Sequence, residues 1–245
     1  MGSAYIYMNE KFKILVVEDE QAILTGLIDV LVFHGYEVDA ASEGNEGLRK
    51  AMTGQFDLVL LDVMLPGING FEICNAIREQ DKQQAIIMLT AKGTDDDIVQ
   101  GLQFGADDYV TKPFSVAQLV LRIQAVLRRS SVAIQNQSRI DLGSDTWIDT
   151  ANLSGGRNGE VLAFTRREIE VLQYLASHHE RPVSRDELLN KVWGYDRGVD
   201  IETRTVDIHI AKIRRKIELD HKAPELLITV RSAGYRLLIS GPDGI

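Results

Sequence analysis

Four short apolar runs in the first half of the chain are each followed by polar residues suited to phosphate and metal chemistry. These residues are Glu18, Asp19 and Glu20 after residues 14–17, Asp62 after residues 58–61, Thr90 after residues 86–89 and Lys112 after residues 109–111. Carboxylate oxygens are the ligands that Mg²⁺ prefers, while lysine and threonine side chains hold phosphate oxygens. If these positions meet in space, the sequence predicts a small site for a divalent cation and a phosphoryl group.

The elements that carry these residues read as a doubly wound α/β domain over residues 11–129. Short apolar runs are typical of fully buried parallel strands, and the carboxyl ends of such strands converge on one crevice. Helical spacing of apolar residues separates the runs, which gives five strand–helix units with right-handed crossovers. We therefore predict a flavodoxin-like parallel sheet with strand order 2-1-3-4-5. The predicted strands end at residues 17, 40, 62, 90 and 112, and the predicted helices cover about 23–34, 43–53, 71–79, 94–104 and 115–129.

The second half predicts a different, α+β architecture. Residues 130–138 lack strong periodicity and are interpreted as a linker, and residues 139–240 as a second domain. Within it, alternating stretches with glycine turns over 139–164 indicate a small antiparallel sheet. Three helical patterns and a final hairpin then predict a winged helix-turn-helix, with helices over 165–178, 184–193 and 203–217 and hairpin strands over 226–230 and 235–239. Thr165 with Glu168, and Ser184 with Glu187, match the capping-box pattern.

Length, cysteine content and apolar patterning bound the class of protein. The chain has 245 residues, which favours two domains. Its one cysteine, Cys74, excludes an internal disulfide and fits a reducing compartment, so we expect a cytoplasmic protein. No apolar stretch approaches the length of a membrane span and no signal peptide is evident, so we expect no membrane partner.

The net charge of −9 disfavours nucleic-acid binding until its distribution is considered. Residues 1–129 hold 11 basic and 19 acidic residues, a net charge of −8, whereas residues 130–245 hold 16 and 17, a net charge of −1. Within the second half, residues 204–216 contain five basic side chains and one acidic one. DNA affinity depends on local phosphate neutralisation, so this segment is a candidate DNA-binding helix.

Several motifs together resemble the OmpR/PhoB family of response regulators, the two-component transcription factors. They are Val-Val-Glu-Asp-Glu at 16–20, Leu-Asp-Val-Met-Leu-Pro-Gly at 61–67, Leu-Thr-Ala at 89–91, Gly-Ala-Asp-Asp-Tyr-Val-Thr-Lys-Pro-Phe at 105–114, Arg-Thr-Val-Asp-Ile-His-Ile at 204–210 and Thr-Val-Arg-Ser-Ala-Gly-Tyr-Arg at 229–236. The resemblance covers almost all of the chain from Lys13 to Leu238. It implies a receiver domain that is phosphorylated by a sensor histidine kinase, followed by a winged-helix DNA-binding domain.

The resemblance also implies a role for each matching residue of the receiver. Asp62 is the expected phosphoacceptor. Thr90 and Lys112 are expected to bind phosphoryl oxygens, and Tyr109 to turn inward as a switch. The expected Mg²⁺ ligands are Asp19, Asp62 and the backbone carbonyl of Met64, with Glu18 acting through water. The peptide bond before Pro113 is expected to be cis.

For the second domain and for assembly, the resemblance implies double-stranded DNA and a second copy of the chain as partners. The expected DNA contacts are Arg204, Thr205, Ile208, His209, Lys212, Arg214, Arg215 and Arg231. The expected dimer surface includes Asp107, Asp108, Arg122 and Arg129, and the dimer is expected to form on phosphorylation and to bind tandem half-sites. The loop 194–203 lies where relatives can touch RNA polymerase.

We therefore predict a phosphorylation-controlled transcription regulator that is not an enzyme beyond slow self-dephosphorylation. Two alternative functions are considered. A phosphorylation-independent DNA-binding regulator with a vestigial receiver is disfavoured by the complete set of Asp19, Asp62, Thr90 and Lys112. A phosphotransferase or phosphatase with Asp62 as nucleophile is disfavoured because Met64 stands where haloacid-dehalogenase-like enzymes carry an acid–base aspartate.

Overall fold

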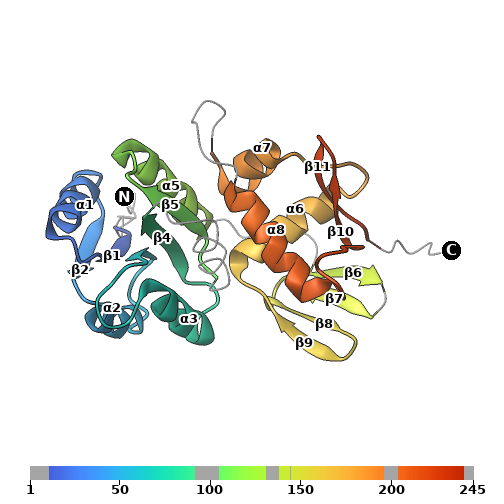
Figure 1. The fold of residues 1–245 in the computed structure, drawn as a ribbon, viewed down its shortest axis with the longest axis horizontal. Helices are drawn as coiled ribbons and strands as arrows, with labels where there is room; N and C mark the ends of the chain where they lie inside the picture. The colour runs from blue at the N-terminus through green and yellow to red at the C-terminus, as the bar shows by residue number, and fades with distance from the viewer. Residues whose placement is uncertain (1–10, 92–104, 131–137, 144, 196–203, 240–245) are drawn as a thin grey trace, which may run out of the picture.

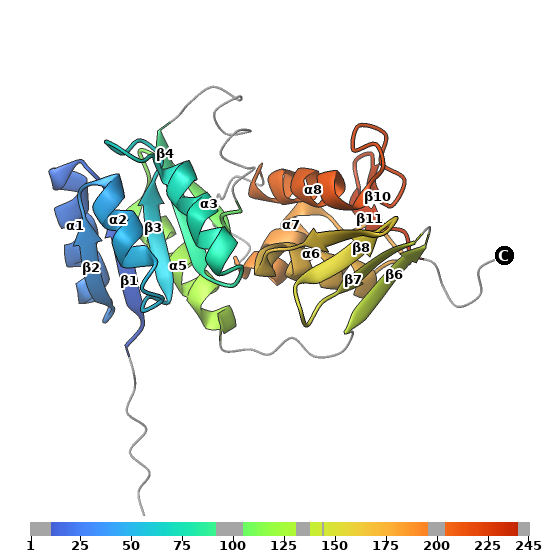
Figure 2. The same cartoon turned by 90° about the horizontal axis from the view of Figure 1, so that it is seen from below.

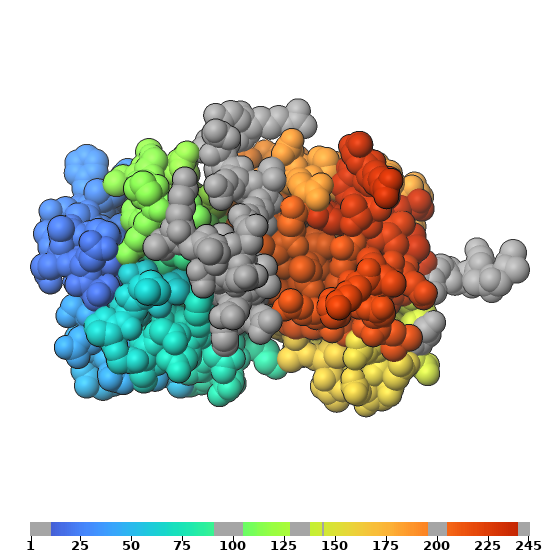
Figure 3. All heavy atoms as spheres, in the orientation of Figure 1, coloured from blue at the N-terminus to red at the C-terminus, as the bar shows by residue number. Residues whose placement is uncertain are grey.

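The computed structural model of the chain describes residues 11–91, 105–130, 138–143, 145–195 and 204–239. These residues form two lobes that lie side by side, one before residue 131 and one after residue 137 (Figures 1 and 3). The predicted helix at 94–104, the centre of the predicted linker and most of the loop 194–203 lie outside the described residues.

The first lobe contains the predicted five-stranded parallel sheet. Its strands are β1(Lys13–Val17), β2(Glu37–Ala41), β3(Leu58–Asp62), β4(Ala85–Ala91) and β5(Asp108–Lys112), in the order β2-β1-β3-β4-β5. The predicted order is therefore confirmed. All neighbouring pairs are parallel, with Val17 opposite Leu61 and Leu61 opposite Met88, so the carboxyl ends of the central strands reach the same edge.

Helices cover both faces of this sheet (Figure 2). Side chains alternate between the two faces of a strand, so each strand supplies two cores. One core packs residues such as Val16, Leu60 and Leu89 against α1(Gln21–Phe33) and α5(Val116–Ser130). The other packs residues such as Val17 and Leu61 against α2(Gly44–Ala51) and α3(Gly70–Gln80).

The second lobe has the predicted winged-helix architecture. An antiparallel sheet of β6(Arg139–Gly143), β7(Thr146–Asp149), β8(Ser154–Arg157) and β9(Glu160–Ala163) precedes α6(Arg166–Ser177), α7(Arg185–Leu188), the π-helical turn η2(Leu189–Trp193), α8(Arg204–Ile217) and the hairpin β10(Leu227–Val230)–β11(Gly234–Leu237). Its core surrounds the fully buried Trp193 and Phe164. No helix in the described ranges is long and apolar enough to cross a membrane.

The two predicted capping boxes differ in outcome. At the start of α6, both reciprocal hydrogen bonds between Thr165 and Glu168 form, so this prediction is confirmed. Ser184 caps α7 by accepting from the Glu187 backbone amide, but the Glu187 carboxylate instead accepts from Tyr174 and Arg181. The helix predicted over 184–193 is also shorter, because α7 passes into the π-helical turn that ends at Gly194 with a φ of 72°.

Candidate functional site

Three polar residues from three strands meet at the carboxyl edge of the parallel sheet. Asp62 and Lys112 are the last residues of β3 and β5, and Glu18 directly follows β1. The Lys112 ammonium Nζ lies 2.9 Å from Asp62 Oδ2 and 2.9 Å from Glu18 Oε1. These residues are 44 to 94 positions apart in sequence, so the parallel topology alone brings them together.

The backbone around Asp62 is held by the loop that leads into α3. The Met64 backbone N–H donates to Asp62 Oδ1 at 3.3 Å, and the Gly70 N–H donates to the Val63 carbonyl at 3.0 Å. A Cβ at Gly70 would lie 2.0 Å from the Asp62 carbonyl oxygen. Glycine is therefore required where α3 begins against the end of β3.

Burial and the neighbouring charges both shift the pKa values of Glu18 and Lys112, the two groups beside Asp62. Glu18 is fully buried and Asp62 is 3% exposed. Burial raises the pKa of Glu18 and the Asp62 charge adds to this, although the hydrogen bond from Lys112 opposes it. Burial lowers the pKa of Lys112, but its hydrogen bonds to Glu18 and Asp62 outweigh that effect and the pKa is raised. Lys112 is thus held as an ammonium between two carboxylates.

The acidic residues fit a divalent cation. One oxygen atom from each of Glu18, Asp19 and Asp62 lies within 4.8 Å of the other two. Asp19 is exposed, which opens the cluster to solvent. Glu18 and Asp62 share the Lys112 ammonium, and Asp19 adds a third carboxylate. Among the described residues, the cluster thus has the excess negative charge and the oxygen ligands that Mg²⁺ requires.

The other residues predicted for this site lie nearby on the same edge. Thr90 is buried near the end of β4, one residue beyond the partner of Asp62 in the strand register. The Met64 side chain is 70% exposed above the loop after β3. The peptide bond between Lys112 and Pro113 is cis, as predicted.

The predicted DNA contacts, on α8 and at Arg231 after β10, divide into a buried and an exposed group. Thr205, Ile208, His209 and Lys212 are all buried in this arrangement. Arg215 and Arg231 are exposed, whereas Arg214 is half-buried and donates to the Leu227 carbonyl and the Thr229 hydroxyl. The side chain of Arg204 lies outside the described residues.

Two members of the buried group, Thr205 and Lys212, contact the first lobe, and Asp108 at the start of β5 is the centre of that contact. Asp108 is fully buried and accepts hydrogen bonds from three side chains: the Tyr195 hydroxyl, the Thr205 hydroxyl at 2.9 Å and the Arg122 guanidinium at 2.7 Å. Burial alone would raise the pKa of Asp108, but the Arg122 charge and the hydrogen bonds from Tyr195 and Arg122 outweigh it and lower the pKa. One carboxylate therefore joins the two lobes.

Neighbouring residues extend the contact on both sides of Asp108. The Trp193 indole N–H donates to the Asp107 carbonyl at 3.2 Å. The Lys212 ammonium donates to the Tyr109 hydroxyl at 3.3 Å and lies 5.6 Å from the centre of its ring. The switch candidate of the receiver is thus in direct contact with the candidate DNA-binding helix.

The residues predicted for the dimer surface are engaged within one chain. Asp107 pairs with Arg78 at 2.9 Å and also accepts from the Ile86 backbone amide at 2.9 Å. Asp108 pairs with Arg122, as described above. The side chain of Arg129 lies outside the described residues. Sequence reasoning did not predict that Tyr195 and Trp193 contact the receiver, and no local pattern in the sequence signals it.

The fold and the site together define a receiver domain joined to a DNA-binding domain, and comparison with known proteins agrees. Residues 14–124 match the response regulator receiver domain, and residues 159–237 match the C-terminal domain of transcriptional regulatory proteins. The chain belongs to the OmpR/PhoB family of two-component response regulators that control transcription.

Individual relatives match along nearly their whole length. The chain is 43% identical to the alkaline phosphatase synthesis transcriptional regulatory protein PhoP of Bacillus subtilis, over 92% of this chain and 96% of the relative. It is 37% identical to the transcriptional regulatory protein CusR of Escherichia coli, over 95% and 99%. Among solved structures, a single-residue mutant of RitR matches with a TM-score of 0.70 and 27% identity, over 94% of this chain and 100% of that one.

Proposed function

We propose that Asp62 accepts a phosphoryl group from a phosphohistidine on a sensor histidine kinase. An Asp62 carboxylate oxygen attacks the phosphorus atom, a phosphorus–oxygen bond forms, and the phosphorus–nitrogen bond breaks. The imidazole leaves with the electron pair. The observation that carries this proposal is the position of Asp62, with Oδ2 2.9 Å from the Lys112 ammonium and with Glu18 and Asp19 beside it. Lys112 and Thr90 are suited to hold the oxygens of the incoming group.

The same residues fit the cation that this transfer needs. Asp19, Asp62 and the backbone carbonyl of Met64 would hold Mg²⁺, with Glu18 acting through water. When bound, the cation supplies the charge neutralisation that lets a carboxylate approach an anionic phosphoryl group. Met64 has no acidic group to activate water, which supports self-dephosphorylation that is slow.

The second lobe is proposed to bind double-stranded DNA with α8 in the major groove and the β10–β11 hairpin as the wing. Arg214, Arg215 and Arg231 are proposed to contact the backbone or the minor groove, and Thr205, Ile208, His209 and Lys212 to face base edges. Two copies joined through their receivers would place two such helices on tandem half-sites, which raises affinity through effective concentration. A contact with RNA polymerase, and action in the cytoplasm, complete the proposal.

The contact between the lobes suggests how phosphorylation controls DNA binding. Thr205, His209 and Lys212 are buried in the described arrangement, so α8 is closed off from base edges. Asp108 and Arg122 are paired with each other and with α8 or Tyr195, so they are not free to join a second receiver. Phosphorylation is proposed to move Thr90 and Tyr109, to break the contact of Tyr109 with Lys212 and to release both surfaces together.

Substitution of Asp62 tests the proposed function. Asp62→Asn keeps the shape of the side chain but removes the attacking carboxylate, so uptake of phosphoryl from a small phosphodonor with Mg²⁺ is expected to be abolished. Asp57→Asn, at an exposed site at the opposite end of the sheet, is the matched control. Intact protein mass spectrometry detects the adduct, and equal uptake in wild type and Asp62→Asn would refute the assignment.

A further inference from the structure

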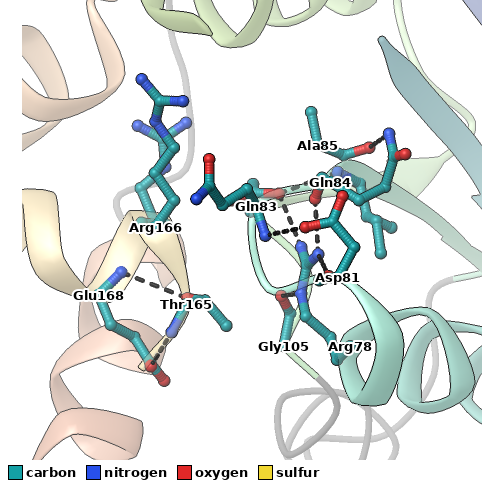
Figure 4. Close-up of polar contacts among 12 residues, drawn as sticks. Arg78, Asp81, Gln83, Gln84, Ala85, Gly105, Thr165, Arg166 and Glu168 are labelled. Carbon is teal, nitrogen blue, oxygen red and sulfur yellow. Dashed lines mark hydrogen bonds and ion pairs between the residues drawn. The ribbon is translucent and has the colours of Figure 1, made fainter. Parts of the chain in front are cut away.

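A cavity of about 500 Å³ lies between the two lobes, on the side of α3 and α8. Its charged lining comprises five basic residues and one acidic residue: Arg78, Lys82, Lys212, Arg215, Lys216 and Glu168. Figure 4 shows Arg78 and Gly105 of the receiver facing Thr165 and Glu168 of the second lobe across this region. The volume falls in the range of small-molecule sites.

Three of the five cations form no ion pair with a carboxylate of the described residues. Arg78 is committed to Asp107 and to the carbonyl oxygens of Gly105 and Gln84, and Lys216 pairs with Glu168 at 2.5 Å. Lys82, Lys212 and Arg215 form no ion pair within the part of the chain that the structure describes. Among the described residues, the cavity therefore has more cations than carboxylates to pair with them.

Lys212 is the most informative of these three residues. It is 6% exposed, and its ammonium has one hydrogen bond among the described residues, to the neutral Tyr109 hydroxyl at 3.3 Å. Burial lowers the pKa of Lys212 to about 8. The charge of Glu168 opposes this shift, but no carboxylate forms an ion pair with Lys212 among the described residues. A buried ammonium in this position is costly, and an anion in the cavity would lower that cost.

A second cavity between the same lobes provides the contrast. It has about 240 Å³ and is lined by Asp57, Asp81, Asp107 and Glu170 as well as by Arg166 and Arg167. Arg167 is paired there with Glu170 at 2.6 Å. The excess of uncompensated cations is therefore a property of the first cavity and not of the domain boundary as a whole.

We propose that the cavity between α3 and α8 binds a small molecule with linked phosphate groups, and that the bound molecule holds the two lobes together. Linked phosphates match the site because cations stand on both walls, Lys82 on the receiver and Lys212 with Arg215 on α8, and one phosphate alone would leave much of the volume unfilled. The ligand would occupy side chains proposed to contact DNA, so it lowers DNA affinity. This last effect rests on the proposed function, whereas ligand binding itself does not.

Titration of the full-length unphosphorylated protein with tripolyphosphate, followed by calorimetry without Mg²⁺, tests the site. Saturable one-to-one binding is expected. Lys82 lies on the receiver and is neither a proposed DNA contact nor part of the phosphoacceptor site, and its exposure means that Lys82→Glu leaves the fold intact. This substitution is expected to weaken binding about tenfold, since charge-assisted hydrogen bonds to phosphate carry this much free energy. Lys11→Glu makes the same charge change at an exposed site outside the cavity and is expected to retain the wild-type affinity.

A second arm measures DNA affinity with and without tripolyphosphate at constant ionic strength. The ligand is expected to weaken DNA binding in wild type and in Lys11→Glu, but much less in Lys82→Glu. If ATP binds more tightly than tripolyphosphate, the ligand is a nucleotide. If ATP binds equally or more weakly, the ligand is a free oligophosphate. Absence of saturable binding, or equal effects of Lys82→Glu and Lys11→Glu, would overturn the proposal. If the protein binds tripolyphosphate saturably but does not bind DNA, the ligand site in the cavity is supported and the proposed function is refuted.

Discussion

Asp62 and Asp108 are both buried carboxylates of the same parallel sheet, yet their surroundings suit different roles. Those of Asp62 suit a chemical reaction, and those of Asp108 suit a structural contact. Asp62 shares one ammonium with Glu18 and has Asp19 open to solvent beside it, so negative charge remains to be neutralised. Asp108 accepts from Tyr195, Thr205 and Arg122 and is closed off from solvent. The carboxyl ends of the strands thus form an open site that can accept a charged group. Asp108 at the start of β5 instead belongs to a closed contact between the lobes.

Removal of Lys112 should produce the largest change at the open site. Lys112→Met deletes the cation that faces Asp62, so the rate of phosphorylation by a small phosphodonor is expected to fall by about 100-fold or more. Lys50→Met is a matched control, because Lys50 also bridges two carboxylates, Asp39 and Glu46, but outside the site. Rates from a time course of adduct formation decide this, and a loss below about threefold in Lys112→Met would contradict the role of Lys112.

Loss of the Asp108 carboxylate should weaken the contact between the lobes. Asp108→Asn removes the charge that neutralises Arg122, so the free energy of unfolding is expected to fall by about 3 kcal/mol. The DNA affinity of the unphosphorylated protein is expected to rise at the same time, because α8 loses its anchor at Thr205. Tyr195→Phe deletes only one hydrogen bond and should cost about 1 kcal/mol.

Denaturant unfolding and fluorescence anisotropy with labelled DNA measure the two effects. Lower stability without any gain in DNA affinity would mean that Asp108 supports the fold of the receiver but does not restrain α8.

The pH dependence of stability should report on the buried side of α8. Burial lowers the pKa of His209 to about 3, whereas the unfolded chain binds a proton with the usual pKa of 6.5. The folded state does not bind that proton until the pH approaches 3. The free energy of unfolding is therefore highest above pH 6.5 and declines as the pH falls from 6.5 towards 3, because protonation stabilises the unfolded chain. Between about pH 6.5 and 5 the decline is expected to reach about 2 kcal/mol.

His209→Gln should lack this part of the slope. Urea unfolding of both proteins at several pH values isolates the contribution as the difference between the two curves. Parallel curves over this range would show that His209 is accessible to protons in the folded state.

The smallest effect is expected at an exposed ion pair. Arg181 donates to both carboxylate oxygens of Glu187, at 2.9 and 2.6 Å, but its side chain is 50% exposed. Arg181→Ala should therefore lower the free energy of unfolding by less than about 1 kcal/mol. A larger loss of unfolding free energy, measured by thermal unfolding, would mean that exposed ion pairs contribute as much to stability as the buried Asp108 contact.

The sequence predicts that Asp62 and Lys112 lie at one edge of the sheet, as the structure has them, but it does not predict the contact between the lobes. Parallel strands place their carboxyl ends together, so Asp62 and Lys112 could be assigned to one edge from strand patterns alone. The contact of Asp108 with Thr205 joins residues 97 positions apart in separate domains, and no periodicity records which faces of two folded domains meet. The π-helical turn after α7 was missed for a related reason, because Trp193 is placed there by tertiary packing.

Capping was predictable only in part. The reciprocal bonds of Thr165 and Glu168 follow from the local pattern, and the pair Asn69 and Glu72 forms the same box at the start of α3. Glu187 departs from its pattern because Arg181 and Tyr174 compete for its carboxylate. Local rules hold where no distant partner offers a stronger hydrogen bond.

We propose that phosphorylation of Asp62 releases α8 from the receiver, and the distance between the two lobes reports this release. Phe33 and Val161 are 87% and 88% exposed on separate lobes, so Phe33→Cys and Val161→Cys can carry spin labels. Cys74 is buried and its thiol pKa is raised to about 11, so it should remain unlabelled.

Pulsed electron paramagnetic resonance should give one narrow distance before phosphorylation and a longer, broader distribution after treatment with a small phosphodonor and Mg²⁺. The same labels in Asp62→Asn should show no change. An identical narrow distance before and after phosphorylation of Asp62 would mean that α8 stays bound to the receiver.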